Sequence, residues 1–152
     1  MTISPDALRI TCDKSELDVA LIHAFLAEQS SWAKGIPLAT VQKSIAHSLC
    51  FGGFLGPAQV AFARVISDFS TFANLVDVFV LPEHRGKGYS RTLTQTVIAH
   101  PDLQGLRRFT LATANAHGLY AQFAFTALHK PETHMERYDS NIYSPAERKR
   151  ES

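Results

Sequence analysis

The segment Val76–Ser90 restricts the fold of this chain more than any other. An apolar run there predicts a buried strand, and apolar residues at helical spacing begin directly after Gly88. Gly86 and Gly88 permit backbone conformations that residues with a Cβ resist, and they let a ligand approach the main chain. Because the first N–H groups of a helix have no intrahelical partner, such a loop is suited to a phosphate or a pyrophosphate. Arg85 and Lys87 add positive charge beside it.

The other apolar patterns predict an α/β domain with the element order β-α-α-β-β-β-α-β-α-β. Short turns between the three middle strands indicate antiparallel pairing, and the strand–helix–strand unit after them indicates a parallel pair with a right-handed crossover. The expected strands are Ala7–Thr11, Cys50–Leu55, Gln59–Ile66, Leu75–Leu81, Arg108–Ala112 and Phe125–Leu128, with a further extended stretch at His134–Tyr138. Four helices are expected. The first begins at a cap at Asp13 or Ser15 and ends at Glu28, and the second runs from Thr40 to Ser48. The third carries Tyr89, Leu93 and Val97 on one face and ends near His100, and the fourth is a short helix around Leu119, Tyr120 and Phe123.

Length and composition limit the classes of protein to which this chain can belong. Its 152 residues fit one domain, expected at residues 1–143, followed by a charged tail at 144–152 that we expect to be flexible. The hydrophobic fraction of 45% is typical of a globular protein, and the net charge of +1 argues against a nucleic-acid partner.

No apolar run approaches the ~18 residues of a membrane span and no basic, apolar leader begins the chain, so we expect no membrane association and a cytoplasmic location. Cys12, Cys50 and the seven histidines lack metal-ligand spacing, so no metal is expected.

Two motifs resemble those of the GNAT superfamily of N-acetyltransferases. The run Arg85–Ser90 is similar to the family's motif A, Gln/Arg-x-x-Gly-x-Gly/Ala, with Ser90 at the last small position. The run Leu119–Phe125 is similar to the family's Leu-Tyr-x-x-x-Gly-Phe pattern, with Ala124 in place of glycine. The resemblance covers about Ala7–Leu128 and implies an α/β, GNAT-like fold. In that fold a central mixed sheet has an antiparallel N-terminal half and a parallel, splayed pair of strands around the cofactor, and helices flank the sheet.

The resemblance also implies acetyl-CoA as cosubstrate. In this family the strand that carries Val80 pairs its backbone with the pantetheine arm, and the amides of the glycine loop bind the pyrophosphate. The family often has an asparagine about seven residues before the helix tyrosine, where this chain has Thr113, so Asn115 is carried over two residues later. The residues that the resemblance assigns to the cofactor are Phe79, Val80, Arg85, Gly86, Lys87, Gly88, Tyr89, Ser90 and Asn115.

Two residues are candidates for the catalysis of acyl transfer to an amine. Tyr120 occupies the position of the family's tyrosine, whose phenol points to the thioester sulfur and protonates the leaving thiolate; the alternative is a core tyrosine. Asp77 interrupts an apolar strand, and it is either the general base or a structural carboxylate that accepts hydrogen bonds. Relatives often place a glutamate base at the neighbouring position, here Val76, so deprotonation through water is a further alternative.

The acceptor is not identified by the sequence. Trp32 and Phe72 are expected either to form apolar walls of the acceptor pocket or to be core aromatics. A small-molecule amine and a protein amine both remain open, whereas the lack of a run of acidic residues disfavours a polyamine. A non-catalytic acyl-CoA-binding or sensor domain is the alternative function, and the sequence leaves a homodimer open.

Overall fold

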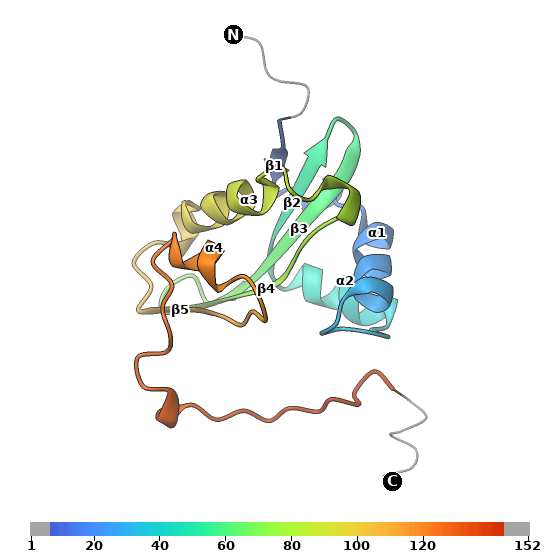
Figure 1. The fold of residues 1–152 in the computed structure, drawn as a ribbon. Helices are drawn as coiled ribbons and strands as arrows, with labels where there is room; N and C mark the ends of the chain where they lie inside the picture. Colours follow the sequence, from blue (N-terminus) through green and yellow to red (C-terminus); the bar gives the residue numbers. More distant parts are fainter. Residues whose placement is uncertain (1–6, 145–152) are drawn as a thin grey trace.

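A five-stranded mixed sheet forms the centre of the protein (Figure 1). The computed structural model describes residues 7–144, so all but the first residue of the predicted 144–152 tail lies outside the described part. The strands follow the order β1-β2-β3-β4-β5 across the sheet; every neighbouring pair is antiparallel except β4 and β5, which are parallel. This arrangement confirms the predicted fold class. The strands are β1 (Arg9–Thr11), β2 (Leu49–Leu55), β3 (Ala58–Ser67), β4 (Phe72–Val80) and β5 (Arg108–Leu111).

Helices pack on both faces of this sheet (Figure 1). None of the helices within residues 7–144 combines the length and the apolar character needed to cross a lipid bilayer. The α-helices are α1 (Val19–Ala24), α2 (Leu38–Ala46), α3 (Tyr89–Ile98) and α4 (His117–Ala121). A π-helical turn, Phe25–Gln29, continues α1, and short 3₁₀ turns lie at Lys14–Glu16, Pro82–His84, Pro101–Leu103 and Pro131–Thr133.

Alternation along the strands divides the core into two clusters. Successive side chains of a strand point to opposite faces. Phe51 of β2 therefore packs with Leu93 of α3, whereas its neighbour Cys50 packs with Ile22 of α1 and Val41 of α2. These five side chains are completely or almost completely buried. The two clusters fix α3 and α4 on one face and α1 and α2 on the other.

The first helix begins later than the sequence predicts. Asp13 does accept a hydrogen bond from the backbone N–H of Ser15 at 3.0 Å, but it begins only the 3₁₀ turn at Lys14–Glu16. Leu17 then returns to an extended conformation and packs into the core. Asp18 is the true cap of α1 and accepts from Leu21 N–H at 3.1 Å. Burial of one leucine thus overrides the capping signal at Asp13.

The strand predicted at Phe125–Leu128 is wrong, and the stretch at His134–Tyr138 pairs with no strand in the described residues. Two hydrogen bonds close the end of α4 instead: Phe125 N–H donates to Tyr120 C=O at 3.2 Å, and Ala124 N–H donates to Ala121 C=O at 3.1 Å. This is the Schellman arrangement, which requires a left-handed residue just after the helix, and Ala124 has φ +68°. The Phe125 ring then packs edge-to-face against Tyr120, so it anchors α4 rather than a strand.

We predict that Ala124→Gly stabilises the protein. An L-residue in the left-handed region is strained, and glycine relieves that strain at some cost in chain entropy, so the free energy of unfolding should rise by roughly 0.5–1 kcal/mol. Denaturant unfolding of the wild type and the variant measures the change. Ala121→Gly, three residues earlier inside α4, is the matched control and should lower stability by about 1 kcal/mol. Equal destabilisation by both substitutions would contradict the prediction.

Candidate active site

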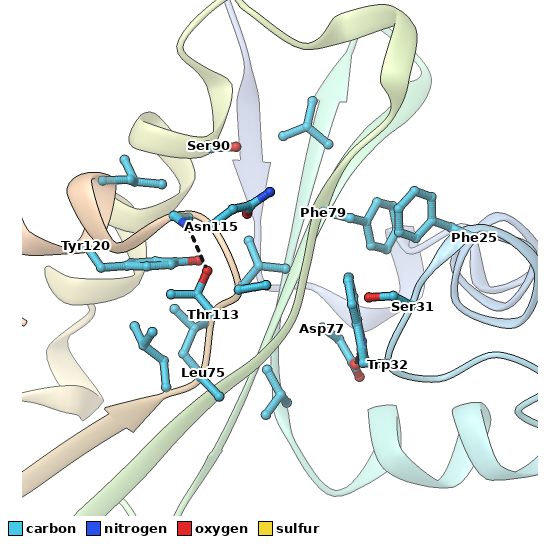
Figure 2. A pocket seen from close by; sticks show the side chains of 18 of the residues that line it. Phe25, Ser31, Trp32, Leu75, Asp77, Phe79, Ser90, Thr113, Asn115 and Tyr120 are labelled. Carbon is cyan, nitrogen blue, oxygen red and sulfur yellow. Dashed lines mark hydrogen bonds between the residues drawn. The ribbon is translucent and has the colours of Figure 1, made fainter. Parts of the chain in front are cut away.

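The parallel strands β4 and β5 separate after a short common stretch. They pair only between Phe72–Leu75 and Arg108–Leu111, and β4 continues to Val80 without β5 beside it. On the side facing β5, the backbone of residues 76–80 therefore has no strand partner. A cleft of about 790 Å³ opens there, with β4 on one wall and residues 111–116 on the other (Figure 2). The open N–H and C=O groups of β4 can pair with an extended, amide-bearing ligand, as a strand would.

A β-bulge lies where the strands separate. Phe62 of β3 pairs with Phe79 of β4, but Arg64 pairs with Val76, so β4 has one residue more than β3 over this stretch. Asp77 lies in that stretch and has φ +52°, a left-handed conformation. A bulge bends its strand and re-aims side chains. Here the bulged stretch of β4 lines the cleft.

The glycine loop ends directly at the N-terminus of α3. Gly86 and Gly88 have φ values of +77° and +82°, and a Cβ built on either would meet no atom within 4 Å. The glycines are therefore required by the backbone conformation and leave open space beside the main chain. Gly88 is the N-cap of α3 and no side chain caps this end. Free space, uncapped amides and the positive end of the helix dipole together fit a pyrophosphate.

The residues predicted to bind the cofactor divide into two groups. The cleft is lined by five of them, namely Phe79, Val80, Arg85, Ser90 and Asn115. The residues between Arg85 and Ser90 are not among those that line it, namely Gly86, Lys87, Gly88 and Tyr89.

The side chains of Tyr89 and Arg85 have more restricted roles than the motif suggests. Tyr89 is only 7% exposed and packs in the same core cluster as Leu93 and Val97, so its side chain belongs to the core. The Arg85 Nε donates to the Val80 carbonyl at 3.0 Å, which fixes the guanidinium beside the last residue of β4. Its remaining N–H groups are suited to phosphate oxygens.

Tyr120 lies across the cleft from β4. It is the last-turn residue of the short helix α4, which begins where Ala116 N–H donates to the Thr113 hydroxyl at 3.0 Å (Figure 2). Its ring is almost fully buried, while the residue still contributes to the cleft wall. Burial raises the pKa of the Tyr120 phenol, because desolvation disfavours the phenolate. The hydroxyl therefore keeps its proton at neutral pH and is able to donate it.

Asp77 and Trp32 meet on the other side of the cleft (Figure 2). The Trp32 Nε1 donates to Asp77 Oδ1 at 2.9 Å, and Arg64 Nε donates to Asp77 Oδ2 at 2.9 Å. Both carboxylate oxygens thus accept a hydrogen bond from the protein. Trp32 lines the cleft, but Phe72 does not. Phe72 lies 40% exposed at the beginning of β4, in the stretch that still pairs with β5, so it is not a buried core aromatic either.

Several lining residues were missed by sequence reasoning. Phe25 stacks on Phe79 with ring centroids 4.0 Å apart, and Gln29 and Ser31 also reach the cleft. Phe25 and Gln29 belong to the π-helical turn, which widens the helix locally and often marks functional sites. Phe25 had the helical spacing of a core residue, and no local signal in the sequence distinguishes a π turn from an α turn.

Within residues 7–144 no group of three or more His, Cys, Asp or Glu side chains is placed to hold a metal ion. One buried polar atom of this described part has no hydrogen-bond partner, the Nδ1 of His84. His84 directly precedes Arg85 in the turn that leads to the glycine loop.

Comparison with known proteins identifies the family. A sequence model of the Acetyltransferase (GNAT) family matches residues 19–125. This chain belongs to that family. A Gibberella zeae protein, provisionally named an acetyltransferase, is 32% identical over 135 residues, which cover 74% of this chain and 75% of that protein.

Solved structures show the same fold. A protein of Xanthomonas campestris pv. campestris, provisionally assigned to the GNAT acetyltransferases, is 61% identical, with a TM-score of 0.89 over 91% of this chain and 97% of that chain. A ribosomal-protein-alanine N-acetyltransferase from Brucella melitensis is 16% identical, with a TM-score of 0.61 over 87% of this chain and 100% of that chain. At such low identity the second similarity supports the fold alone.

We predict that the Tyr120 phenol ionises at higher pH than a free tyrosine. Subtracting the ultraviolet absorbance titration of Tyr120→Phe from that of the wild type isolates its ionisation. Because the folded-state pKa is raised by burial, the neutral phenol contributes stability below the unfolded-state pKa, and this contribution is lost as the pH rises through the folded-state pKa. A difference curve with the midpoint of free tyrosine would contradict the buried position.

Proposed function

We propose that this protein transfers an acetyl group from acetyl-CoA to an amine, which attacks the thioester directly. One observation carries the proposal: the open backbone of β4, the two ends of the glycine loop (Arg85 and Ser90) and the Tyr120 side chain all line one cleft. An acyl-CoA thioester needs all three features: donors for its diphosphate, pairing for its amide-containing arm and an acid for its sulfur.

The proposed cofactor site follows from the positions of these groups. The main chain of Val78–Val80 pairs with the pantetheine amides, since β5 has already separated from β4 at this level. The amides of Gly86–Ser90 and the guanidinium of Arg85 hold the diphosphate at the N-terminus of α3. Phe79 and Asn115, on opposite walls, border the thioester end.

The proposed chemistry requires one acid and no covalent enzyme intermediate. The amine nitrogen forms a bond to the acetyl carbonyl carbon, and the carbon–sulfur bond then breaks. Tyr120 gives its proton to the departing sulfur, and solvent or the amine's own proton later restores the phenol. Backbone N–H groups at the β4 bulge stabilise the oxyanion. Orientation in the cleft provides the remaining acceleration, because thioester and amine are held at reacting distance.

The acceptor is less constrained than the cofactor. The Brucella melitensis structure is named for ribosomal-protein alanine, and an Arabidopsis thaliana structure with a TM-score of 0.59 and 12% identity is named for glucosamine-6-phosphate. The same fold therefore accepts a protein in one case and a sugar phosphate in the other, so fold alone does not fix the acceptor. The amine of this protein must be inferred from its own pocket.

The cofactor assignment predicts that CoA stabilises the wild type but not Gly88→Trp. A ligand at 100 times its Kd that binds only the folded state adds about 2.7 kcal/mol, measurable as a rise in Tm. Gly105→Trp is the matched control, because Gly105 also has a left-handed φ, +72°, and open space beside it, yet it precedes β5 and is not at the N-terminus of α3. Both variants should lose similar stability from backbone strain, but only Gly88→Trp should lose the CoA-induced rise. An unchanged rise in Gly88→Trp would refute the pyrophosphate assignment.

The acid assignment predicts that Tyr120→Phe lowers kcat and kcat/KM together by about a hundredfold, because the lost proton transfer occurs only in the transition state. CoA affinity, measured by titration calorimetry, should change little. Full kcat in Tyr120→Phe would contradict the assignment. If CoA binds tightly but no amine in a broad panel is acetylated, the alternative function, an acyl-CoA sensor, is supported instead.

A further inference from the structure

The single tryptophan of this chain is both exposed and held in place. Trp32 lies between the π-helical turn and α2, and 51% of it is exposed at the cleft. Its Nε1 nevertheless donates a hydrogen bond of 2.9 Å to the carboxylate of Asp77, 45 positions away in the sequence. Its ring also lies tilted against Phe25, with centroids 6.4 Å apart. Exposed aromatic side chains that are fixed in this way are suited to contact a ligand, since little side-chain entropy remains to be lost on binding.

The Asp77 carboxylate, which accepts the hydrogen bond of Trp32, is itself fixed by Arg64. Arg64 of β3 donates from Nε to Asp77 Oδ2 at 2.9 Å and from Nη1 to the Ser48 hydroxyl at 3.0 Å. The side chains of Arg64 and Asp77 are 15% and 10% exposed. Asp77 adopts its left-handed conformation in the bulge, which aims the carboxylate between Trp32 and Arg64. A chain of hydrogen bonds therefore runs from Ser48, just before β2, through Arg64 of β3 and Asp77 of β4 to the indole at the cleft.

This arrangement leaves little uncompensated negative charge for a substrate. Among residues 7–144, the charged side chains that line the cleft are Asp77 and Arg85. Asp77 is paired with Arg64, and the other titratable groups that face it are the buried thiol of Cys50 on β2 and, across the cleft, Tyr120. A second positive charge on the acceptor would thus lack a free partner, whereas an apolar or aromatic group would cover Trp32 and Phe25.

We infer that Asp77 is a positioning residue, which fixes the Trp32 indole as a wall for an acceptor amine with an apolar or aromatic substituent and no second positive charge. That the ligand at Trp32 is an acceptor amine rests on the proposed function. The support of the Trp32 indole by hydrogen bonds does not depend on that function. Asp77 is then a structural carboxylate and not the general base, so another group or water removes the proton from the amine.

Fluorescence of the single tryptophan tests the support directly. Trp32 and Arg64 donate to different oxygens of Asp77, and in Asp77→Asn the NH2 group, which only donates, takes the place of one of these oxygens, so one of the two partners loses its acceptor. We expect faster quenching of Trp32 emission by acrylamide and lower anisotropy in this variant, and neither change in Ile66→Ala. Ile66 is an exposed apolar residue of β3 outside the cleft and serves as the matched control. Unchanged quenching in Asp77→Asn would overturn the positioning role, whatever the protein's function.

Steady-state kinetics test the acceptor wall. Trp32→Ala and Asp77→Asn should each raise KM for an aromatic amine about tenfold, the discrimination that one apolar contact provides, with a smaller effect on kcat and none on CoA affinity. Trp32→Phe keeps a ring and should fall between these variants and the wild type. The acidic limb of the kcat/KM pH profile should persist in Asp77→Asn. Loss of that limb together with collapse of kcat would identify Asp77 as the base and overturn the inference.

The choice of amine tests the substrate class. Arylalkylamines should be preferred over diamines of similar length, and preference for the diamines would overturn the proposed class. If no amine is acetylated, binding of the same amines to the CoA-loaded protein is followed by Trp32 emission. Failure of the proposed function then appears as absence of transfer or of CoA binding, whereas failure of this inference appears as diamine preference or as a Trp32 insensitive to Asp77→Asn.

Discussion

The separation of β4 from β5 is the constraint on which the rest of this structure depends. After four paired positions, the backbone of β4 has lost its partner on one side and must be satisfied by solvent or a ligand. The separation is stable because each strand is held from elsewhere: β4 by its long antiparallel pairing with β3, and β5 by Phe109, which packs edge-to-face on Phe125 with centroids 5.6 Å apart. Two separate anchors keep open a cleft that direct pairing would otherwise close.

Local features of the structure were predictable because local physics decides them. The glycine loop, the start of α3 and the tyrosine of α4 depend on turn chemistry and helical spacing within a few residues. The prediction was wrong at Phe125–Leu128, since an apolar run also fits a helix-terminal anchor, and nothing local reveals that Phe125 packs on Tyr120. The cap at Asp18 was missed for a similar reason: burial of Leu17, a tertiary effect, moves the start of α1.

The two walls of the candidate site differ in how far local sequence describes them. Most residues proposed for the cofactor lie in the segment 79–90, whereas the wall around Trp32 is assembled from the π-helical turn, β3 and β4. Trp32 and Asp77 were each identified as candidates, but not as partners, because 45 residues separate them. The predicted role of Phe72 depends on the register of the parallel pair. That register places Phe72 opposite Arg108, in the closed part of the sheet, and a sequence pattern with period two does not specify it.

Residues with left-handed backbone show where side chains are required despite strain. Among the described residues three non-glycine positions have positive φ, namely Phe69 in the β3–β4 turn, Asp77 in the bulge and Ala124 after α4. Such conformations cost on the order of 1–3 kcal/mol and persist where the surroundings over-determine them. Ala124 is exposed, so burial of its methyl group does not offset the strain, and glycine is the better residue. At Asp77 glycine would relieve the backbone but would leave the half-buried Arg64 without its anion and Trp32 without its acceptor. The carboxylate therefore offsets the strain of its own backbone. One residue, Asp77, both lies in the bulged stretch that lines the cleft and supports the aromatic wall of that cleft.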